Sequence, residues 1–408
     1  MTNVMDGIRI LEVAEHTFVP AASAILADWG AEVIKIEHVE RGDAMRGLMS
    51  SGIAGFGGAV HVLMENANRG KKSLALDLAN PAGVEILYRL TEQCDVFLTN
   101  KMPGVRERLH IDLDDIRAHN PDIVYVRGTG YGSHGPDADA GGYDFLGYWA
   151  RGCSADAATP PNIEGLITQP APAYGDNIGA MTIAGGICAA LLHRERTGEA
   201  PVVDVSLLAT GMWAMSGAIA SSLVSGTKWT APPSTGHPSP SNPLVGTYRT
   251  SDGRYLAFSM LQGFQYWPEV CRRVGRDELI DDPRFDSVEH LMKNTPEAAA
   301  ILDVEIGSRP LSEWKERLTG MKGQWAVVQN TLEVADDPQV DANTYIQELT
   351  TDEGTPFRLV TTPVQFDDEA APIHRSPTFN EHGDAILEEM LGLDWDAVVD
   401  LKVKGVVA

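Results

Sequence analysis

Hydrophobic and polar residues follow two alternating patterns along the first 130 residues of the chain. Short apolar runs rich in β-branched residues predict strands, and the longer amphipathic stretches between them predict helices. The strand-like runs are Ile8–Val13, Glu32–Ile36, Ser73–Leu78, Asp95–Leu98 and Ile123–Arg127. Repeated strand–helix units of this kind predict an α/β fold, Rossmann-like, with a parallel sheet covered by helices.

Helix boundary residues support this alternation. Pro20–Trp29 has a proline at its start and Gly30 at its end, and Asn80 with Pro81 opens a helix over Pro81–Gln93. Proline in a first turn and glycine after a last turn are typical helix boundaries.

Two long uncharged stretches follow, Ile178–Leu192 and Val205–Val224. We expect the first to form a buried helix that extends to His193. The second is long enough to suggest a membrane span, but it is rich in Ala, Ser, Gly and Thr and a polar loop follows it. A buried core helix is therefore the preferred interpretation of Val205–Val224.

The pattern changes near residue 226. Pro and Ser residues fill Thr230–Pro243, where we expect a loop or lid, and Gly246–Met260 predicts a hairpin that turns at Ser251-Asp252-Gly253. Three helices are expected next, over Tyr266–Val274, Pro296–Ile306 and Leu311–Thr319. We predict a large Rossmann-like domain over 1–225 and a smaller α+β domain over 226–335. Segment 336–408 then returns to the large domain.

Charge, cysteine content and one turn limit the partners, the location and the cofactor that we expect for this chain. The net charge of −25 excludes nucleic acid or an anionic membrane as a general partner, since both attract basic surfaces. The four cysteines are far apart, which predicts neither disulfides nor a zinc site and favours a cytoplasmic protein. The turn after the first strand, Glu12 to Pro20, has no G-x-G-x-x-G, so NAD is not the expected cofactor.

Asp176 is the candidate catalytic residue. It directly precedes the uncharged stretch that begins at Ile178, so it lies at a predicted helix N-terminus. The helix dipole and free backbone N–H groups would keep its carboxylate ionised, and a fixed carboxylate can attack an activated acyl group. The alternative is that Asp176 only caps the helix.

Six ordered sequence blocks resemble the class III CoA-transferase family, which includes formyl-CoA and carnitine CoA-transferases and α-methylacyl-CoA racemases. The blocks are Met5–Val13 with Asp28–Glu37, Asn68–Ser73, Asn100–Gly104 with Arg108, Gly130–Asp144, Gly175-Asp176, and Arg375–Pro377 with Glu381-His382. The resemblance implies that Asp176 forms a mixed anhydride with the acyl group of a donor acyl-CoA and then an aspartyl-CoA thioester. An acceptor carboxylic acid finally takes the CoA. It also implies a homodimer of two chains threaded like linked rings.

The same resemblance implies a coenzyme A site and no metal. Its candidate residues are His38, Arg69, Lys71, Lys72, Asn100, Lys101, Arg108 and Tyr143. Each cation taken alone is equally compatible with a solvated surface. His38 stands where relatives often have arginine. The resemblance therefore leaves it undecided whether this chain makes that phosphate contact.

Two alternatives remain. Racemases of the family carry histidine where this chain has Tyr143, so acyl transfer is favoured over proton abstraction. A catalytically silent CoA-binding protein is the other alternative. Six aromatic residues either form an acyl pocket or belong to the core: Trp213, Trp229, Tyr248, Phe264, Trp267 and Trp325.

Overall fold

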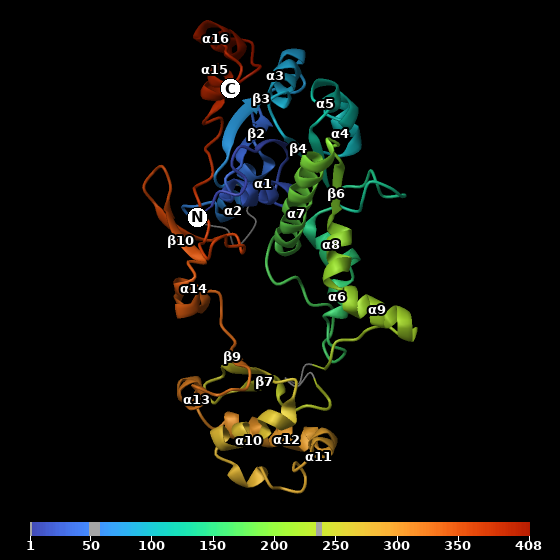
Figure 1. The fold of residues 1–408 in the computed structure, drawn as a ribbon, viewed down its shortest axis with the longest axis vertical. Coiled ribbons are helices and arrows are strands. Elements are labelled where there is room, and N and C mark those ends of the chain that lie inside the picture. The colour runs from blue at the N-terminus through green and yellow to red at the C-terminus, as the bar shows by residue number, and fades with distance from the viewer. Residues whose placement is uncertain (1, 49–57, 234–238) are drawn as a thin grey trace. The chain divides into compact units, whose positions relative to one another are not determined.

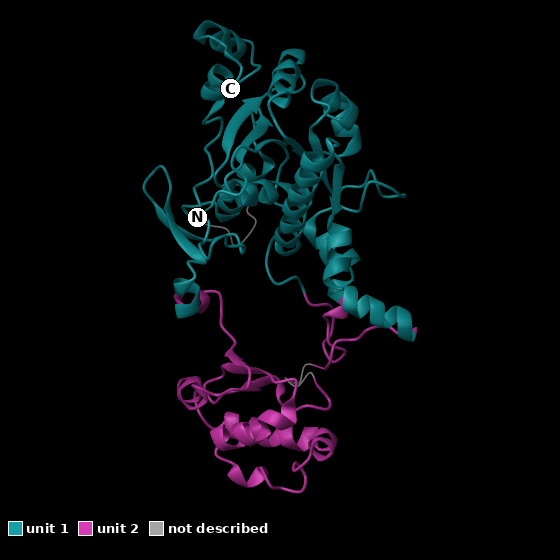
Figure 2. Ribbon diagram, in the orientation of Figure 1, with its two compact units in different colours: residues 1–155, 168–225, 338–408 teal, residues 156–167, 226–337 magenta. Residues whose placement is uncertain are grey.

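The computed structural model describes residues 2–48, 58–233 and 239–408. The chain divides into two compact units (Figure 2). The first contains residues 1–155, 168–225 and 338–408, and the second contains 156–167 and 226–337. Part of the Pro/Ser-rich loop expected over Thr230–Pro243, residues 234–238, lies outside the described residues.

A six-stranded parallel sheet forms the centre of the first unit (Figure 1). Its strands lie in the order β3-β2-β1-β4-β5-β6, and every neighbouring pair is parallel. Their bounds are β1 Arg9–Val13, β2 Glu32–His38, β3 Lys72–Leu76, β4 Val96–Thr99, β5 Val124–Thr129 and β6 Val202–Ser206. This order is that of a doubly wound nucleotide-binding fold, and it confirms the predicted Rossmann-like α/β class.

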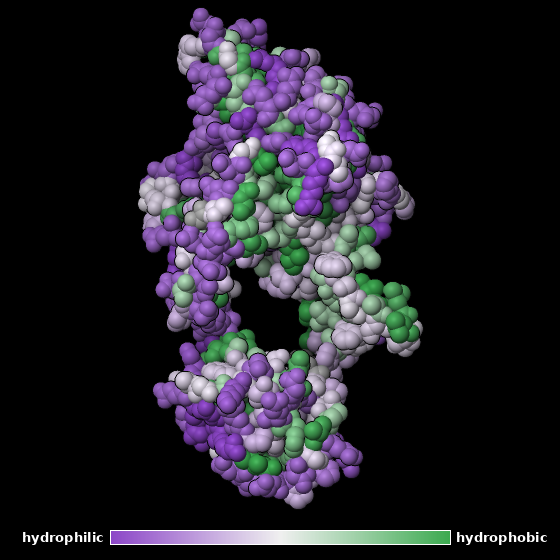
Figure 3. All heavy atoms as spheres, viewed as in Figure 1, coloured by the Kyte–Doolittle hydropathy of each residue, from purple (hydrophilic) through white to green (hydrophobic). Residues whose placement is uncertain are grey.

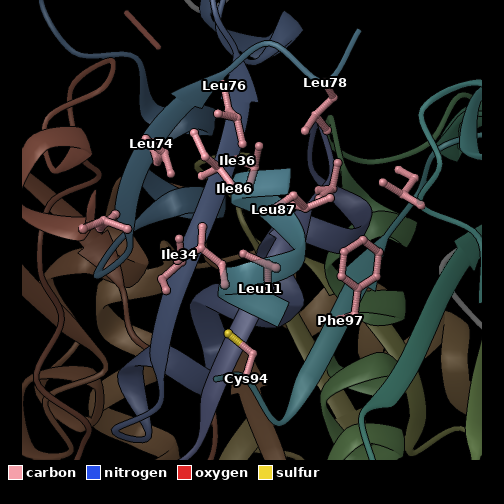
Figure 4. Close-up of a cluster of buried hydrophobic side chains, with 14 of the residues drawn as sticks. Leu11, Ile34, Ile36, Leu74, Leu76, Leu78, Ile86, Leu87, Cys94 and Phe97 are labelled. Atoms are coloured by element: carbon pink, nitrogen blue, oxygen red, sulfur yellow. The ribbon is translucent and has the colours of Figure 1, made fainter. Parts of the chain in front are cut away.

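Helices cover the sheet. Before β6, the α-helices are α1 Phe18–Asp28, α2 Val62–Asn68, α3 Pro81–Thr91, α4 Pro103–Arg108, α5 Leu113–His119, α6 Ser154–Ala157 and α7 Tyr174–Thr197. Short turns of other helix types are η1 Ala44–Gly47 and η2 Phe145–Arg151. Ile86 and Leu87 of α3 pack on Leu11, Ile34 and Phe97 of the strands, in the buried cluster drawn in Figure 4.

The last segment of the chain completes this unit. It contains α14 Pro338–Ala342, the antiparallel pair β10 Ile346–Thr350 and β11 Pro356–Val360, α15 Gly383–Glu389 and α16 Trp395–Val403. It also covers the edge strand β3. The backbone N–H of His382 donates to the carbonyl of Ser73 at 3.0 Å, and that of Asp77 donates to Val406 at 2.9 Å.

The two long uncharged stretches differ from their predicted burial. In α7 one face is buried, including Gly179, Ile183 and Ile187, while Leu192 is exposed. The stretch expected as one buried helix over Val205–Val224 is instead α8 Leu207–Ala214 and α9 Ser216–Ser225, bent by 71°. None of the α9 residues is buried, so the expected core helix is wrong there. By length and composition alone α7, and the bent pair α8–α9, pass a test for membrane-crossing helices, which core helices of soluble proteins also pass.

The second unit holds a three-stranded antiparallel sheet in the order β7-β8-β9. Its elements are β7 Val245–Arg249, β8 Tyr255–Ser259, α10 Gly263–Val274, η3 Asp277–Leu279, α11 Val288–Lys293, α12 Thr295–Ile306, α13 Leu311–Leu318, β9 Trp325–Val327 and η4 Glu333–Asp336. Tyr248 and Trp267 are fully buried in its core, so neither lines an acyl pocket within this unit.

Candidate functional site

A cavity lies at the carboxyl edge of the parallel sheet in the first unit. In a doubly wound sheet, ligands bind where the strand order reverses, which here is between β1 and β4. The turns after these two strands, together with the start of α7, enclose a cavity of about 380 Å³. His16, Asn100, Tyr143 and Asp176 line this cavity.

Asn100 and Asp43 hold the turn after β1 in place. The Asn100 side chain accepts a hydrogen bond from the backbone N–H of Glu15 at 3.1 Å and donates one to the Glu15 carbonyl at 2.7 Å. Oδ1 of Asp43 accepts from the backbone N–H of His16 at 3.1 Å. The His16 ring then meets the Tyr143 ring edge to face, with 5.6 Å between their centroids. Tyr143 is 65% exposed, so it is a cavity wall residue and not a packed core tyrosine.

Asp176 lies in the first turn of α7, as predicted, but it does not cap the helix. The residue before the helix is Ala173, whose φ is 58° and which offers no side-chain cap. The cap comes from Asp144, whose Oδ1 accepts from the backbone N–H of Gly175 at 3.1 Å. A side chain at Gly175 would place its Cβ 2.4 Å from this same Oδ1, so only glycine permits the approach. The helix end is thus neutralised by Asp144, and the carboxyl of Asp176 is free to face the cavity.

The two carboxyl groups influence each other. Burial and then the charge of Asp144 raise the pKa of Asp176 from 3.8 to about 7. Burial also raises the pKa of Asp144, although hydrogen bonds from Gly175 and Gln169 oppose the rise. The expectation that the helix end holds Asp176 ionised is therefore not met in the free protein, because burial and then the charge of Asp144 raise the pKa of its carboxyl to about 7.

A second cavity of about 240 Å³ adjoins the first. Residues at the carboxyl ends of β1, β2 and β3 line it, among them Val13, His38 and Leu76. The two cavities share the wall residues Glu15, Arg41, Lys101, Val105 and Arg108. The structure thus brings the predicted residues Asn100, Lys101, Arg108 and Tyr143 around the first cavity with Asp176, and His38 into the second.

Three predicted cations lie elsewhere. The guanidinium of Arg69 is buried against Asp28, with Nη2 2.8 Å from Oδ2. Nζ of Lys71 is fully buried, 2.7 Å from Oε2 of Glu12. Lys72 pairs with Glu32 at the opposite, amino edge of the sheet. Neither cavity includes these three residues, because each side chain points to a carboxylate of the fold.

Lys71 supports the site indirectly through a buried ionic network. Glu12 accepts from both Lys71 and Lys35, and Lys35 pairs with Asp43 at 2.7 Å. Burial, with the nearby charge of Lys35, lowers the pKa of Lys71 to about 8. Because Asp43 also holds His16, the network ties the interior of the sheet to the cavity wall.

Asp144 and Arg41 belong to the site, although the sequence analysis assigned them no role. Asp144 belongs to the block Gly130–Asp144 that carries the resemblance, but its capping of a helix that begins at Tyr174 depends on tertiary structure. Arg41 lies in the turn shortly after β2, which ends at His38, and a cation in the turn after a parallel strand is a signal that sequence analysis can use. No group of three or more His, Cys, Asp or Glu side chains suited to a metal occurs in the part of the chain that the structure describes.

Known proteins resemble this chain along nearly its whole length. The model of CoA-transferase family III matches residues 5–383. The (R)-2-hydroxy-4-methylpentanoate CoA-transferase of Clostridioides difficile is 27% identical over 405 residues, which cover 99% of each chain. The succinyl-CoA:glutarate CoA-transferase of Homo sapiens is 29% identical over 424 residues, covering 100% of this chain and 91% of the relative.

A solved structure supports the same relationship. The CAIB/BAIF family protein from Brucella suis superposes with a TM-score of 0.81 at 27% identity, over 96% of this chain and 100% of that protein. Since the family model spans most of the sequence and the relatives align along nearly all of it, this chain belongs to CoA-transferase family III and is a CoA-transferase.

Proposed function

We propose that this enzyme moves CoA from a donor acyl-CoA to an acceptor carboxylic acid through covalent intermediates on Asp176. The observation that carries the proposal is the position of Asp176. Its carboxyl faces a 380 Å³ cavity at the carboxyl edge of the sheet, while Asp144 satisfies the helix end behind it. A carboxyl group that is held in place but makes no cap is available as a nucleophile.

The proposed reaction exchanges one carboxylate for another. The Asp176 carboxylate attacks the thioester carbon, the C–S bond breaks, and a mixed anhydride and CoA thiolate form. The thiolate attacks the aspartyl carbonyl, which releases the donor acid and leaves an aspartyl-CoA thioester. The acceptor carboxylate then attacks this thioester and expels the thiolate. In the last step the thiolate attacks the acceptor's carbonyl and regenerates Asp176, so no metal or redox step is needed.

The protonation of Asp176 fits this sequence of steps. With a pKa of about 7, a substantial fraction of Asp176 is ionised at neutral pH and can attack. An acyl-CoA that fills the cavity brings a neutral thioester to the carboxyl. The product anhydride no longer carries the charge that Asp144 repels. Charge repulsion in the free enzyme thus favours formation of the covalent intermediate.

A panel of donors tests the proposal. The enzyme is incubated with succinyl-CoA and with CoA esters of 2-hydroxy acids, trapped with hydroxylamine and analysed by peptide mass spectrometry. We expect a hydroxamate at Asp176 that is missing in Asp176→Ala and kept in Asp281→Ala, where the replaced residue is exposed and far along the chain in the second unit. If CoA binds but no donor gives an adduct at Asp176, the covalent route is refuted, and a silent CoA-binding protein is favoured when no deuterium exchanges at the α-carbon either.

One observation favours an α-methylacyl-CoA racemase or epimerase as the second candidate. His16 lines the same cavity as Asp176, and removal and return of an α-proton needs two groups that can exchange protons, such as a histidine and a carboxyl group. Incubation of a branched acyl-CoA in deuterium oxide separates the two. Deuterium at the α-carbon without an adduct on Asp176 supports the racemase.

We propose further that the enzyme is a homodimer, in the interlocked form that the resemblance implies. The support is the exposed apolar surface of α8 and α9, visible in Figure 3. Trp213 is 79% exposed, Leu223 80% and Val224 91%. A contiguous apolar surface of this kind is typical of a protein interface. The cytoplasmic location suggested by the separated cysteines stays a prediction.

A further inference from the structure

The walls of the 380 Å³ cavity differ in charge. Within the described part of the chain, its lysines and arginines all follow β2 or β4: Arg41, Lys101, Arg106 and Arg108. By contrast, α1, the end of β5 and the start of α8 contribute only uncharged residues: Phe18, residues 128–130 and Leu207. The proposed anhydride bonds the acyl group to Asp176, so the wall beside Asp176 determines which acyl groups fit.

Phe18 lies on the wall beside Asp176. Gly179 comes three residues after Asp176 in α7, so the two residues share a face of the helix. A Cβ at Gly179 would lie only 2.3 Å from Cε2 of Phe18, so the aromatic ring rests directly on the helix backbone. The ring therefore lies one helical turn along from Asp176, a rise of about 5 Å.

The opposite edge of the Phe18 ring faces β5. A Cβ at Gly128 of this strand would lie 3.1 Å from Cε1 of Phe18, and 2.1 Å from Cγ2 of the neighbouring Val19. Strand and helix thus both approach the ring through a glycine, and the ring is only 6% exposed. Because protein interiors are close-packed, a ring held at both edges cannot swing aside for a larger ligand. Phe18 is a rigid boundary of the cavity.

The same wall offers no partner for a charged acyl group. Leu207, the first residue of α8, is 2% exposed and lines the cavity. The side-chain oxygen of Thr129 already accepts a hydrogen bond from the backbone N–H of Gly132 at 3.0 Å. A carboxylate at the far end of an acyl group would lose its water here without gaining a cation, whereas an apolar end would be buried favourably.

We propose that Phe18 determines the acyl specificity of this enzyme, and that together with Leu207 it restricts the acyl group to short, uncharged ones. This inference rests on the proposed function and deepens it, because it names the class of acid that Asp176 activates. The acyl carbon is bonded to Asp176, and the rigid ring lies one helical turn away. A short apolar acyl group therefore fits against the ring, and a long one meets it.

The rate of hydroxamate formation at Asp176 tests this specificity without an acceptor acid. Each donor is supplied at low concentration with hydroxylamine, so the rates compare donors directly. Butyryl-CoA should react at least about tenfold faster than octanoyl-CoA in the wild type, because the ring excludes the longer chain. 4-Methylpentanoyl-CoA should react at least about tenfold faster than succinyl-CoA, which has a carboxylate in place of the isopropyl group.

Phe18→Leu makes the boundary smaller while it keeps an apolar side chain of similar volume, so the variant should fold. Its octanoyl-to-butyryl rate ratio should rise roughly 10- to 100-fold over the wild type. Its preference for 4-methylpentanoyl-CoA over succinyl-CoA should stay, because the wall remains uncharged. The matched control is Phe285→Leu, the same exchange at a fully buried phenylalanine of the second unit, and both of its ratios should equal those of the wild type.

The outcomes separate this inference from the proposed function. A wild type that forms no hydroxamate with any donor would overturn both. Hydroxamate in the wild type, with rates that change by the same factor for every donor in Phe18→Leu, would make Phe18 a packing residue and leave CoA transfer standing. A wild type that prefers succinyl-CoA would overturn the uncharged acyl group, and one that prefers octanoyl-CoA would overturn the boundary at Phe18.

Discussion

Replacing Asp176 by asparagine removes a carboxyl group whose ionisation the fold disfavours. The folded protein has a pKa of about 7 at this residue, against 3.8 for an unperturbed aspartate. Between these two values the folded state keeps a proton that the unfolded chain has released. Wild-type stability therefore falls as pH rises through this range, while a neutral amide does not contribute such a fall. The stability of Asp176→Asn relative to the wild type should thus increase from pH 4 to pH 7 and stay constant above.

The size of the gain follows from the same shift. A difference of about three pKa units corresponds to about 4 kcal/mol as an upper limit. Asp176 is partly accessible and lies near the positive end of α7, and both factors favour the charged form, so we expect about 2–3 kcal/mol. For a chain of 408 residues this predicts a rise in melting temperature of about 2–4 °C at pH 8.

Scanning calorimetry across pH 4.5–8.5 measures this gain, with Asp281→Asn as a control that replaces an exposed aspartate. The wild type and the control should show parallel curves, and the Asp176→Asn curve should separate from them as pH rises. A melting-temperature difference that is the same at every pH would refute the link between stability and the protonation of this carboxyl. So would a less stable variant at pH 8.

Three further predictions concern activity, the buried network and assembly. If the ionised Asp176 is the nucleophile, kcat/KM should fall about tenfold per pH unit below about pH 7. Asp144→Asn should move this acidic limb of the pH profile to lower pH, because it removes the charge that raises the pKa of Asp176. An acidic limb that stays in place contradicts the charge coupling. Lys71→Met should lose about 3–5 kcal/mol of stability in a denaturant titration, while the KM for acyl-CoA stays unchanged. Arg108→Ala should raise that KM without changing stability. The reverse pattern would mean that Lys71 belongs to the CoA site. Val224→Asp should lower the melting temperature of the interlocked dimer, whose linked chains stay together, and an unchanged melting temperature would exclude α9 from the interface.

Most strands were predictable because buried parallel strands carry apolar runs. The predicted run Glu32–Ile36 lies within β2. The strand β6 was missed because it lies at the sheet edge, carries Asp204 and is only partly buried, so it shows no such run. The break at Met215 between α8 and α9 was missed for another reason: an uncharged stretch shows composition but not which faces another surface covers.

The site was predictable where one residue determines the chemistry, and not where distant partners do. The location of Asp176 followed from the sequence and the resemblance to the family. Its protonation did not, because Asp144 caps Gly175 from 31 residues earlier in the chain. Likewise Arg69 and Lys71 are neighbours in a basic cluster, but their partners Asp28 and Glu12 lie in other elements. A basic cluster shows where charge occurs in the chain and not the direction of each side chain.

The C-terminal segment covers the edge strand β3, and this has a consequence for synthesis of the protein. The backbone N–H of Ala75 bonds to the side chain of Asn380, 305 residues later in the chain. At roughly 5–20 residues per second, the ribosome needs about 15–60 s to make that partner. During this time the edge of the sheet has open hydrogen-bonding groups that can pair with another nascent chain. Residues 226–337 emerge within this interval as one stretch with their own core, so the second unit can fold before the first is complete.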